Sequence, residues 1–176
     1  TFIENRRKRK VESATQKMGS KNTTQDSRQG AIEYLAGQKG YAAIWGLLQR
    51  FNYIIDKSIV DTDEKERVVE YVLAFGNEAI KPIEDYIKKN STIAWPLKIL
   101  RKLSSEGEYI QFLVGNLSVE ETLFDQQAEE KKIDILHYLE EFKNDVVFEK
   151  ARKLLYDYDE RIRLAALSVL EKQASE

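Results

Sequence analysis

Residues 61–90, DTDEKERVVEYVLAFGNEAIKPIEDYIKKN, decide the fold that the sequence predicts. In the first half of this stretch, apolar residues recur at the spacing that lays a stripe along one side of a helix. These residues are Val68, Val69, Val72, Leu73 and Phe75. Gly76-Asn77 interrupts the stripe. The pattern therefore predicts a helix that ends near Phe75.

A second helix follows directly in the same stretch. Its apolar stripe consists of Ala79, Ile80, Ile83, Tyr86 and Ile87, and charged side chains fill the opposite side. Asn77 is a suitable N-cap for this helix. The two helices together predict an antiparallel hairpin with a very short turn. Because two helices of about a dozen residues are marginally stable alone, the hairpin needs neighbours to pack against.

The rest of the chain supplies similar helices. Apolar stripes occur in residues 31–36, 43–51, 93–103, 109–117, 133–142, 146–155 and 162–170. When the second helix of each hairpin is aligned, Ile44, Ile80, Ile110 and Phe148 correspond, with offsets of 36, 30 and 38 residues. Such offsets are in the range of two-helix repeats. The chain is therefore expected to be a series of related hairpins.

Composition indicates the same class of fold. The chain of 176 residues is 42% hydrophobic and 33% charged, with only eight Gly and two Pro. Because this number of turn residues is too small for a many-stranded sheet, we expect an all-α protein. The absence of Cys excludes disulfides and thiol ligands. No apolar run is long enough to cross a bilayer and no signal peptide is visible, so we expect a cytoplasmic domain.

Charge divides the chain into two expected parts, a basic arm or linker at residues 1–25 and a helical domain at residues 26–176. Residues 1–29 hold eight basic and three acidic side chains, a net charge of +5, and the remaining 20 basic and 27 acidic side chains give −7. The basic run in the arm is Arg6, Arg7, Lys8, Arg9 and Lys10. It suits nucleic-acid phosphates, anionic lipid headgroups or a nuclear import receptor, although short basic runs are equally common as solvated tails.

The sequence opens with Thr1, so we expect further residues upstream. A preceding apolar span would leave the basic run at the cytosolic face of a membrane.

Two stretches resemble a known repeat family. Residues 159–170, DERIRLAALSVL, resemble the pattern of a turn aspartate followed by Val-Arg, Ala and Ala-Leu in HEAT repeats, which include the short HEAT-like repeats of phycobilisome lyases. Residues 76–83, GNEAIKPI, resemble the turn and second helix of another such unit. The resemblance covers about residues 26–173 and implies an α-solenoid of about four to five stacked antiparallel hairpins. In that family the aspartate caps a helix and the arginine pairs with neighbouring acidic groups. Asp159 and Arg163 are therefore expected to be structural.

Few residues suggest catalysis or metal binding. With His137 as the single histidine and no Cys, a zinc site of the usual ligand types cannot be built. Glu121, Asp125 and Glu129 share a helical face and would bind a hard cation weakly, but acidic runs are far more often solvated surface. No phosphate-binding loop or hydrolase motif occurs. We therefore expect no enzyme activity, cofactor, metal or small-molecule substrate.

The expected function is a non-enzymatic scaffold that binds another protein within a larger assembly. Stacked hairpins expose a row of second helices as a binding surface. The candidate contact residues there are Trp45, Arg50, Lys81, Glu84, Asp85, Lys88 and Lys89. Trp45 is the preferred anchor because it lies one place off its apolar stripe; Tyr53, Trp95, Tyr156 and Tyr158 are further aromatic candidates that more often belong to a core.

Three alternative functions stay open. Residues 6–10 favour nucleic-acid binding, by the arm alone or by a HEAT-like body that follows backbone shape as some HEAT-like DNA glycosylases do. The same residues fit the cytosolic domain of a membrane protein. A lyase or chaperone for a bound pigment rests on the family resemblance alone.

Overall fold

The computed structural model describes residues 2–118 and 125–174, and every regular element in these ranges is a helix. The expectation of an all-α chain is therefore confirmed. The helices form two compact units, Thr1–Leu103 and Ser104–Glu176. The boundary falls between the apolar stripes at residues 93–103 and 109–117. The two units are described separately below.

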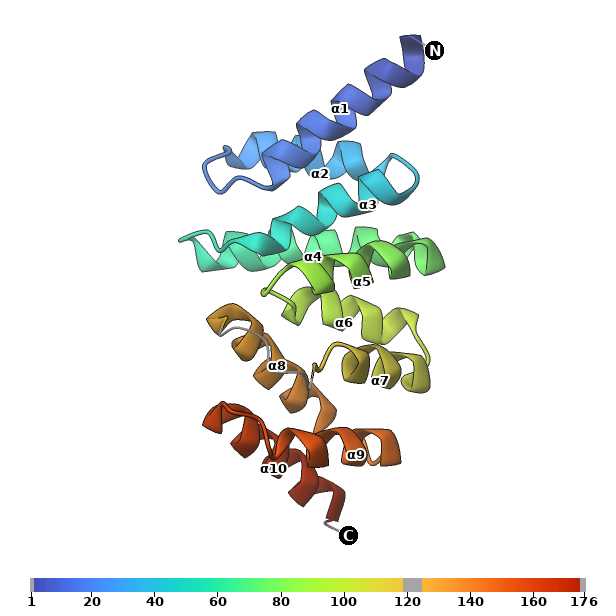
Figure 1. Cartoon of the computed structure of the whole chain (residues 1–176). Coiled ribbons are helices and arrows are strands. Elements are labelled where there is room, and N and C mark those ends of the chain that lie inside the picture. The colour runs from blue at the N-terminus through green and yellow to red at the C-terminus, as the bar shows by residue number, and fades with distance from the viewer. Residues whose placement is uncertain (1, 119–124, 175–176) are drawn as a thin grey trace. The chain divides into compact units, whose positions relative to one another are not determined.

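The first unit contains six α-helices that pack in two rows (Figure 1). They are α1 (Phe2–Met18), α2 (Gln25–Ala36), α3 (Tyr41–Leu48), α4 (Ser58–Ala74), α5 (Ile80–Lys89) and α6 (Ala94–Leu103), with short 3-10 helices η1 (Gln49–Asn52) and η2 (Gly76–Ala79). In one row α1 packs against α3 and α3 against α5. In the other row α2 packs against α4 and α4 against α6. Alternate helices of the chain therefore lie side by side.

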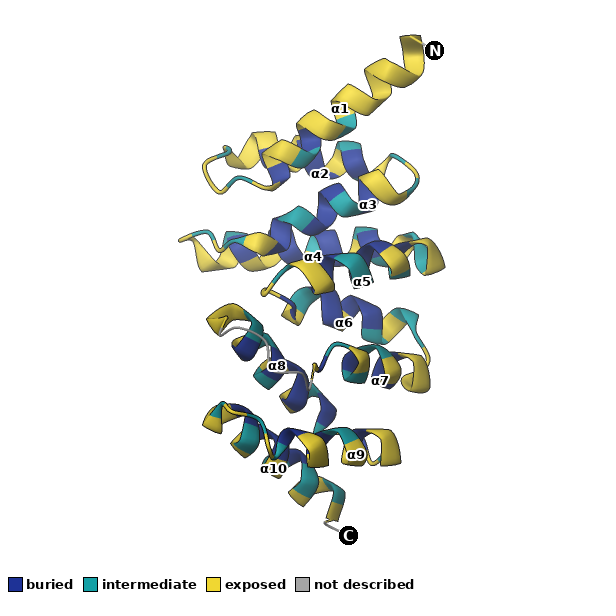
Figure 2. Cartoon of the chain, viewed as in Figure 1, coloured by how far each residue is buried: buried dark blue, intermediate teal, exposed yellow. Residues whose placement is uncertain are grey.

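The first helix differs from the expected arm or linker. Residues 2–18 are helical, and the C-terminal half of α1 packs against α2 and α3. Ala14 and Met18 are buried at i, i+4 spacing, and Figure 2 shows that the N-terminal half of α1 is exposed. The expectation was wrong because it weighed the many polar residues of this segment and overlooked this narrow apolar stripe. Packing begins within α1, so residue 25 is not a domain boundary.

The turn between α4 and α5 also differs in detail from the expectation. Asn77 does not cap α5, because η2 covers residues 76–79 and α5 begins at Ile80. Gly76 has φ of 59°, a left-handed conformation that L side chains rarely adopt. The sequence therefore correctly predicted that the helical pattern is interrupted at Gly76. The tight turn between α4 and α5 is a 3-10 helix.

The second unit contains four described helices, α7 (Glu106–Gly115), α8 (Gln126–Leu139), α9 (Asp145–Leu154) and α10 (Glu160–Ala174). Here too alternate helices pack together, α7 with α9 and α8 with α10. Ser105 caps α7: its side chain accepts from Glu108 N, and the Glu108 carboxylate accepts from Ser105 N at 2.9 Å. Over the described residues, no helix has the length and apolarity needed to span a membrane.

Candidate functional site

An aromatic and charged surface lies where α3 packs against α5, and we call it the Trp45 patch (Tyr41, Trp45, Lys81, Asp85 and Lys89). The ring of Trp45 stacks on that of Tyr41, with centroids 6.0 Å apart and planes 10° apart. The ammonium of Lys89 lies 5.2 Å from the centroid of the Trp45 ring. The indole is half-buried, and Tyr41 is 45% exposed. The stacked rings of Tyr41 and Trp45 are therefore partly exposed to solvent, with the ammonium of Lys89 beside them.

A polar rim holds one side of the Trp45 patch. The hydroxyl of Tyr41 donates to Asp85 Oδ2 at 3.1 Å, and Lys81 Nζ lies 2.8 Å from Asp85 Oδ1. The hydrogen bond from Lys81 lowers the pKa of Asp85, whereas burial and the bond to Asp85 raise the pKa of Tyr41. Asp85 and Lys81 are therefore ionised at neutral pH and Tyr41 is not, and the hydrogen bond to Asp85 holds the ring of Tyr41 where it stacks on the indole.

Helical spacing explains how the patch is assembled. Tyr41 and Trp45 are four residues apart on α3, and Lys81, Asp85 and Lys89 are four residues apart on α5, so each set lies on one helical face. Buried Tyr86 joins the two helices beneath the patch. Its ring meets that of Trp45 edge-on, with centroids 6.1 Å apart, and burial raises its pKa to about 12.

Most of the predicted contact residues lie at or beside this patch. Trp45, Lys81, Asp85 and Lys89 belong to it. Glu84 and Lys88 lie on the same helix, where Glu84 contributes to the raised pKa of Lys81 and Lys88 to the lowered pKa of Asp85.

Arg50 was wrongly predicted to be a surface contact. Its side chain is completely buried, and Nε lies 2.7 Å from Glu64 Oε2 while one terminal nitrogen lies 2.7 Å from Asp61 Oδ1. The prediction failed because η1 turns this side chain inward against α4. Arg50 is thus unavailable to a partner.

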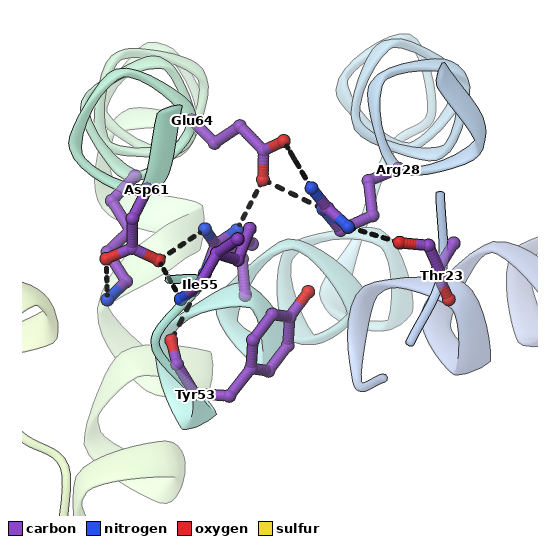
Figure 3. A network of polar contacts seen from close by, with 8 residues as sticks. Thr23, Arg28, Tyr53, Ile55, Asp61 and Glu64 are labelled. Atoms are coloured by element: carbon purple, nitrogen blue, oxygen red, sulfur yellow. Dashed lines mark hydrogen bonds and ion pairs between the residues drawn. The ribbon is translucent and has the colours of Figure 1, made fainter. Parts of the chain in front are cut away.

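A buried charge network surrounds this guanidinium, and we call it the Arg50 network (Arg28, Arg50, Asp61, Glu64 and Lys65; Figure 3). Arg28 Nη2 lies 2.9 Å from Glu64 Oε1, and Lys65 Nζ lies 2.7 Å from Asp61 Oδ2. The five side chains come from α2, η1 and α4. The network therefore joins three segments of the first unit.

Backbone groups extend the Arg50 network to the loops. Arg28 donates to the carbonyl of Thr23, Arg50 donates to that of Tyr53 at 3.2 Å, and Asp61 Oδ1 accepts from Ile55 N at 3.0 Å (Figure 3). These bonds connect the buried charges of the network to the loops that flank η1 and α2.

The carboxylates of the Arg50 network have lowered pKa values. Burial alone would raise the pKa of Glu64 and of Asp61, but hydrogen bonds from Arg28 and Arg50 to Glu64, and from Lys65 and Arg50 to Asp61, outweigh it. Both acids are therefore ionised at neutral pH. A sequence signal for them existed, since Asp61, Glu64 and Lys65 continue the helical spacing of the buried Val68 and Val72.

The other aromatic candidates have varied surroundings. The guanidinium of Arg50 lies 4.7 Å from the ring centroid of half-buried Tyr53. Trp95 stacks on Phe51 with centroids 6.1 Å apart and planes 2° apart. Tyr156 is 88% exposed, whereas the hydroxyl of Tyr158 donates to the buried carboxylate of Glu129. In the first unit, Trp45 is thus the candidate that combines a half-open ring with neighbouring charges on a second helix.

The candidate cation ligands are used otherwise or lie outside the described residues. Glu121 is among the latter. Asp125 caps α8 by accepting from Gln127 N at 3.0 Å, and Glu129 is fully buried with Lys132 Nζ 3.6 Å from Oε2. The single histidine, His137, is exposed, with Nδ1 3.1 Å from Glu140 Oε1. Within residues 2–118 and 125–174, no group of three or more metal-ligating side chains is placed to hold an ion.

Asp159 and Arg163 have structural contacts, as expected, but one partner differs. Asp159 Oδ1 accepts from Arg161 N at 2.8 Å at the start of α10. Arg163 donates to the carbonyls of Asp157 and Tyr158, each at 2.9 Å, where the resemblance implied an acidic side chain. Both residues therefore shape the turn into the last helix.

The basic run lies on an ordered helix. Residues 6–10 are all exposed on α1, and Arg7 Nε donates to Gln38 Oε1 at 2.9 Å. Thr1–Leu103 carries 19 basic and 13 acidic side chains, a net charge of +6, whereas Ser104–Glu176 carries 9 and 17, a net charge of −8. Residues 1–29 account for +5 of this +6, so the positive charge of the first unit is concentrated on α1 and the start of α2.

No protein-family model, curated protein or solved structure matches this chain.

Proposed function

We propose that this protein is a non-enzymatic, HEAT-like α-solenoid scaffold that binds another protein through the Trp45 patch. The packing of alternate helices in two rows within each unit supports this proposal, since stacked hairpins of a solenoid pack in this way. In such a scaffold, α3 and α5 belong to the row of second helices that forms the binding surface. The partner would be one component of a larger assembly.

The Trp45 patch itself is the observation that carries the proposal. Tryptophan and tyrosine dominate the binding energy of protein interfaces because each buries a large apolar area at a low cost in side-chain entropy. The rings of Tyr41 and Trp45 are already stacked, and the Asp85 rim holds Tyr41 in place. A partner that covers these rings would therefore bind a preorganised surface.

The charges around the patch define the partner's chemistry. Lys81, Lys88 and Lys89 are exposed on α5, together with half-exposed Glu84 and Asp85. A complementary surface would place an apolar or aromatic side chain on the indole and carboxylates opposite Lys88 and Lys89. Such charged rims mainly increase the rate of association and the specificity.

Photo-crosslinking followed by titration tests the proposal. A photoreactive residue replaces Lys88 beside the patch, and the matched control carries it at the exposed Lys102 on α6. The proposal predicts a protein that crosslinks from position 88 and not from position 102. The purified partner should then bind the Lys88→Glu/Lys89→Glu variant more weakly than the wild type. Equal binding by both proteins would count against the Trp45 patch.

Nucleic-acid binding through α1 is a second candidate function. The exposure of residues 6–10 on a helix of a unit with net charge +6 favours it. Replacing all five basic residues with Gln tests it without deleting the buried part of α1. Affinity for a duplex or single strand that falls steeply with salt and is lost in this variant would support it. An affinity that does not respond to salt would exclude it.

A further inference from the structure

A groove between α1 and α2 is separate from the Trp45 patch. It has a volume of about 410 Å³ and is lined by Lys10, Ser13, Ala14, Lys17, Ser27, Gly30, Ala31 and Tyr34. On each helix the lining residues follow the i, i+3, i+4, i+7 spacing, so each helix contributes one continuous face. We call this site the α1–α2 groove.

The floor of the α1–α2 groove is formed by small residues. Ala14 and Ala31 are buried there, and a Cβ atom added at Gly30 would meet no atom within 4 Å. The empty space over Gly30 contrasts with Gly46 of α3, where an added Cβ would lie 2.5 Å from Thr15 Oγ1. The α3-facing side of α1 is therefore closely packed, whereas the groove beside α2 is open.

The charged side chains that line the groove are both positive. Lys10 and Lys17 are its charged lining residues, and no carboxylate lines it. Among the residues that the structure describes, neither ammonium has an ion-pair partner, and Arg7 extends the same edge of α1 towards Gln38. The occupant that complements this groove is acidic.

The spacing of the two lysines indicates the form of that occupant. Seven residues on an α-helix span about 10.5 Å, so two carboxylates seven residues apart on a facing helix match Lys10 and Lys17. Small or apolar side chains between those carboxylates would lie over Ala14, Gly30 and Ala31. A continuous phosphate backbone fits less well, because the neutral floor separates the two ammoniums. We propose that the α1–α2 groove binds an acidic amphipathic helix of a partner protein.

A designed peptide tests this proposal on the full chain. The probe is a fluorescein-labelled, alanine-rich helical peptide with Glu at positions i and i+7 and Leu at i+3 and i+4. We expect saturable binding that weakens as salt is added. The same peptide with Gln at both Glu positions should bind about tenfold more weakly, since two exposed ion pairs are lost. Equal affinity for the two peptides would overturn the proposal.

Matched variants of the protein locate the binding site. Lys10→Gln/Lys17→Gln should reduce the affinity about tenfold. The control Lys21→Gln/Lys39→Gln removes the same charge from exposed positions that do not line the groove and should bind like the wild type. Gly30→Leu should abolish binding by filling the floor while it keeps both lysines. If the control and the groove variant lost the same affinity for the peptide, the loss would reflect the overall charge of the protein. The proposal that the peptide binds in the α1–α2 groove would then be wrong.

Two further probes separate the peptide from other polyanions. A labelled single-stranded oligonucleotide and vesicles of phosphatidylcholine with phosphatidylserine are titrated under the same salt conditions. The proposal predicts that neither competes with the acidic peptide at matched charge concentration. If Gly30→Leu weakens binding of the oligonucleotide or the vesicles and not of the peptide, the groove is a phosphate or membrane site and the proposal is wrong. None of these variants alters the Trp45 patch, so its test is independent.

Discussion

Nε of Arg50 lies 2.7 Å from Oε2 of Glu64 in a part of the first unit from which solvent is excluded. The side chain of Arg50 has no exposed surface, and that of Glu64 is 6% exposed. Such a buried ion pair contributes little more to stability than well-packed apolar residues of similar size would. Removal of one partner, however, leaves an uncompensated buried charge and is strongly destabilising. The Arg50 network therefore makes the contacts between α2, η1 and α4 strongly dependent on each member.

Arg50→Met should destabilise the protein by about 3–5 kcal/mol, because it leaves the carboxylates of Asp61 and Glu64 without their shared guanidinium. Urea denaturation, followed by circular dichroism, measures the loss. The control is Lys81→Met, which removes the exposed ion pair with Asp85 and should leave the free energy of unfolding nearly unchanged. A similar small change in both variants would show that the network contributes no more than a surface pair.

The same network makes a prediction about acid. The folded protein lowers the pKa of Glu64 and Asp61 below their ordinary values of 4.5 and 3.8. A carboxylate with a lowered folded pKa stabilises the protein above its ordinary pKa, and this stabilisation is lost as pH falls through the lowered value. The free energy of unfolding should therefore decrease as pH falls below about 4.5.

Comparison with a variant assigns this acid dependence. Asp61→Asn/Glu64→Gln is less stable at neutral pH but should lose less additional stability between neutral and acidic pH, because neither amide titrates. Denaturant titrations at a series of pH values measure both slopes. If the free energy of unfolding decreased equally with falling pH in the variant and the wild type, groups other than Asp61 and Glu64 would cause the acid sensitivity.

Two glycines of the first unit should respond in opposite ways to substitution by alanine. At Gly46 the new Cβ would lie 2.5 Å from Thr15 Oγ1 and 3.0 Å from Leu35 Cδ1, so Gly46→Ala should destabilise the protein by about 1–3 kcal/mol. At Gly30 the space is open, and Gly30→Ala should stabilise α2 by about 0.5–1 kcal/mol. Thermal denaturation should show a lower melting temperature for Gly46→Ala and a higher one for Gly30→Ala than for the wild type.

A double variant connects the Gly46 effect to the packing of α1. Thr15→Ala removes the nearest obstructing atom, so it should recover part of the loss that Gly46→Ala causes. Independent, additive effects would indicate that α1 does not pack against α3 as described. This outcome would restore the view of residues 1–25 as a separate arm.

The sequence predicted the helices through patterns that are local. The stripe from Val68 to Ile87 and the break at Gly76 both act within a few residues, and each is present in the structure. The helicity of residues 2–18 was missed because one short apolar stripe was hidden among polar side chains.

The sites depend on contacts between distant residues, so the sequence predicted them only in part. Trp45 and Lys89 were both proposed, yet nothing in the local pattern indicated that the cation would lie over the ring. Arg50 was assigned to the surface because its partners, Asp61 and Glu64, lie on another helix. The α1–α2 groove was missed for the same reason, since it requires one face from each of two helices.

The affinity of the purified partner for Trp45→Ala tests the central claim most directly, and isothermal titration calorimetry measures it. Loss of a central aromatic contact should weaken binding by at least about 30-fold, whereas the variant with Gln at residues 6–10 should stay within about twofold of the wild type. Lys89→Glu, which keeps the indole, should weaken binding to a smaller extent. Because Lys89 is exposed, this variant tests the patch without disturbing the packing that Trp45→Ala alters. Unchanged affinity in both patch variants, with binding lost in the residue 6–10 variant, would contradict the proposal and assign binding to the basic run of α1.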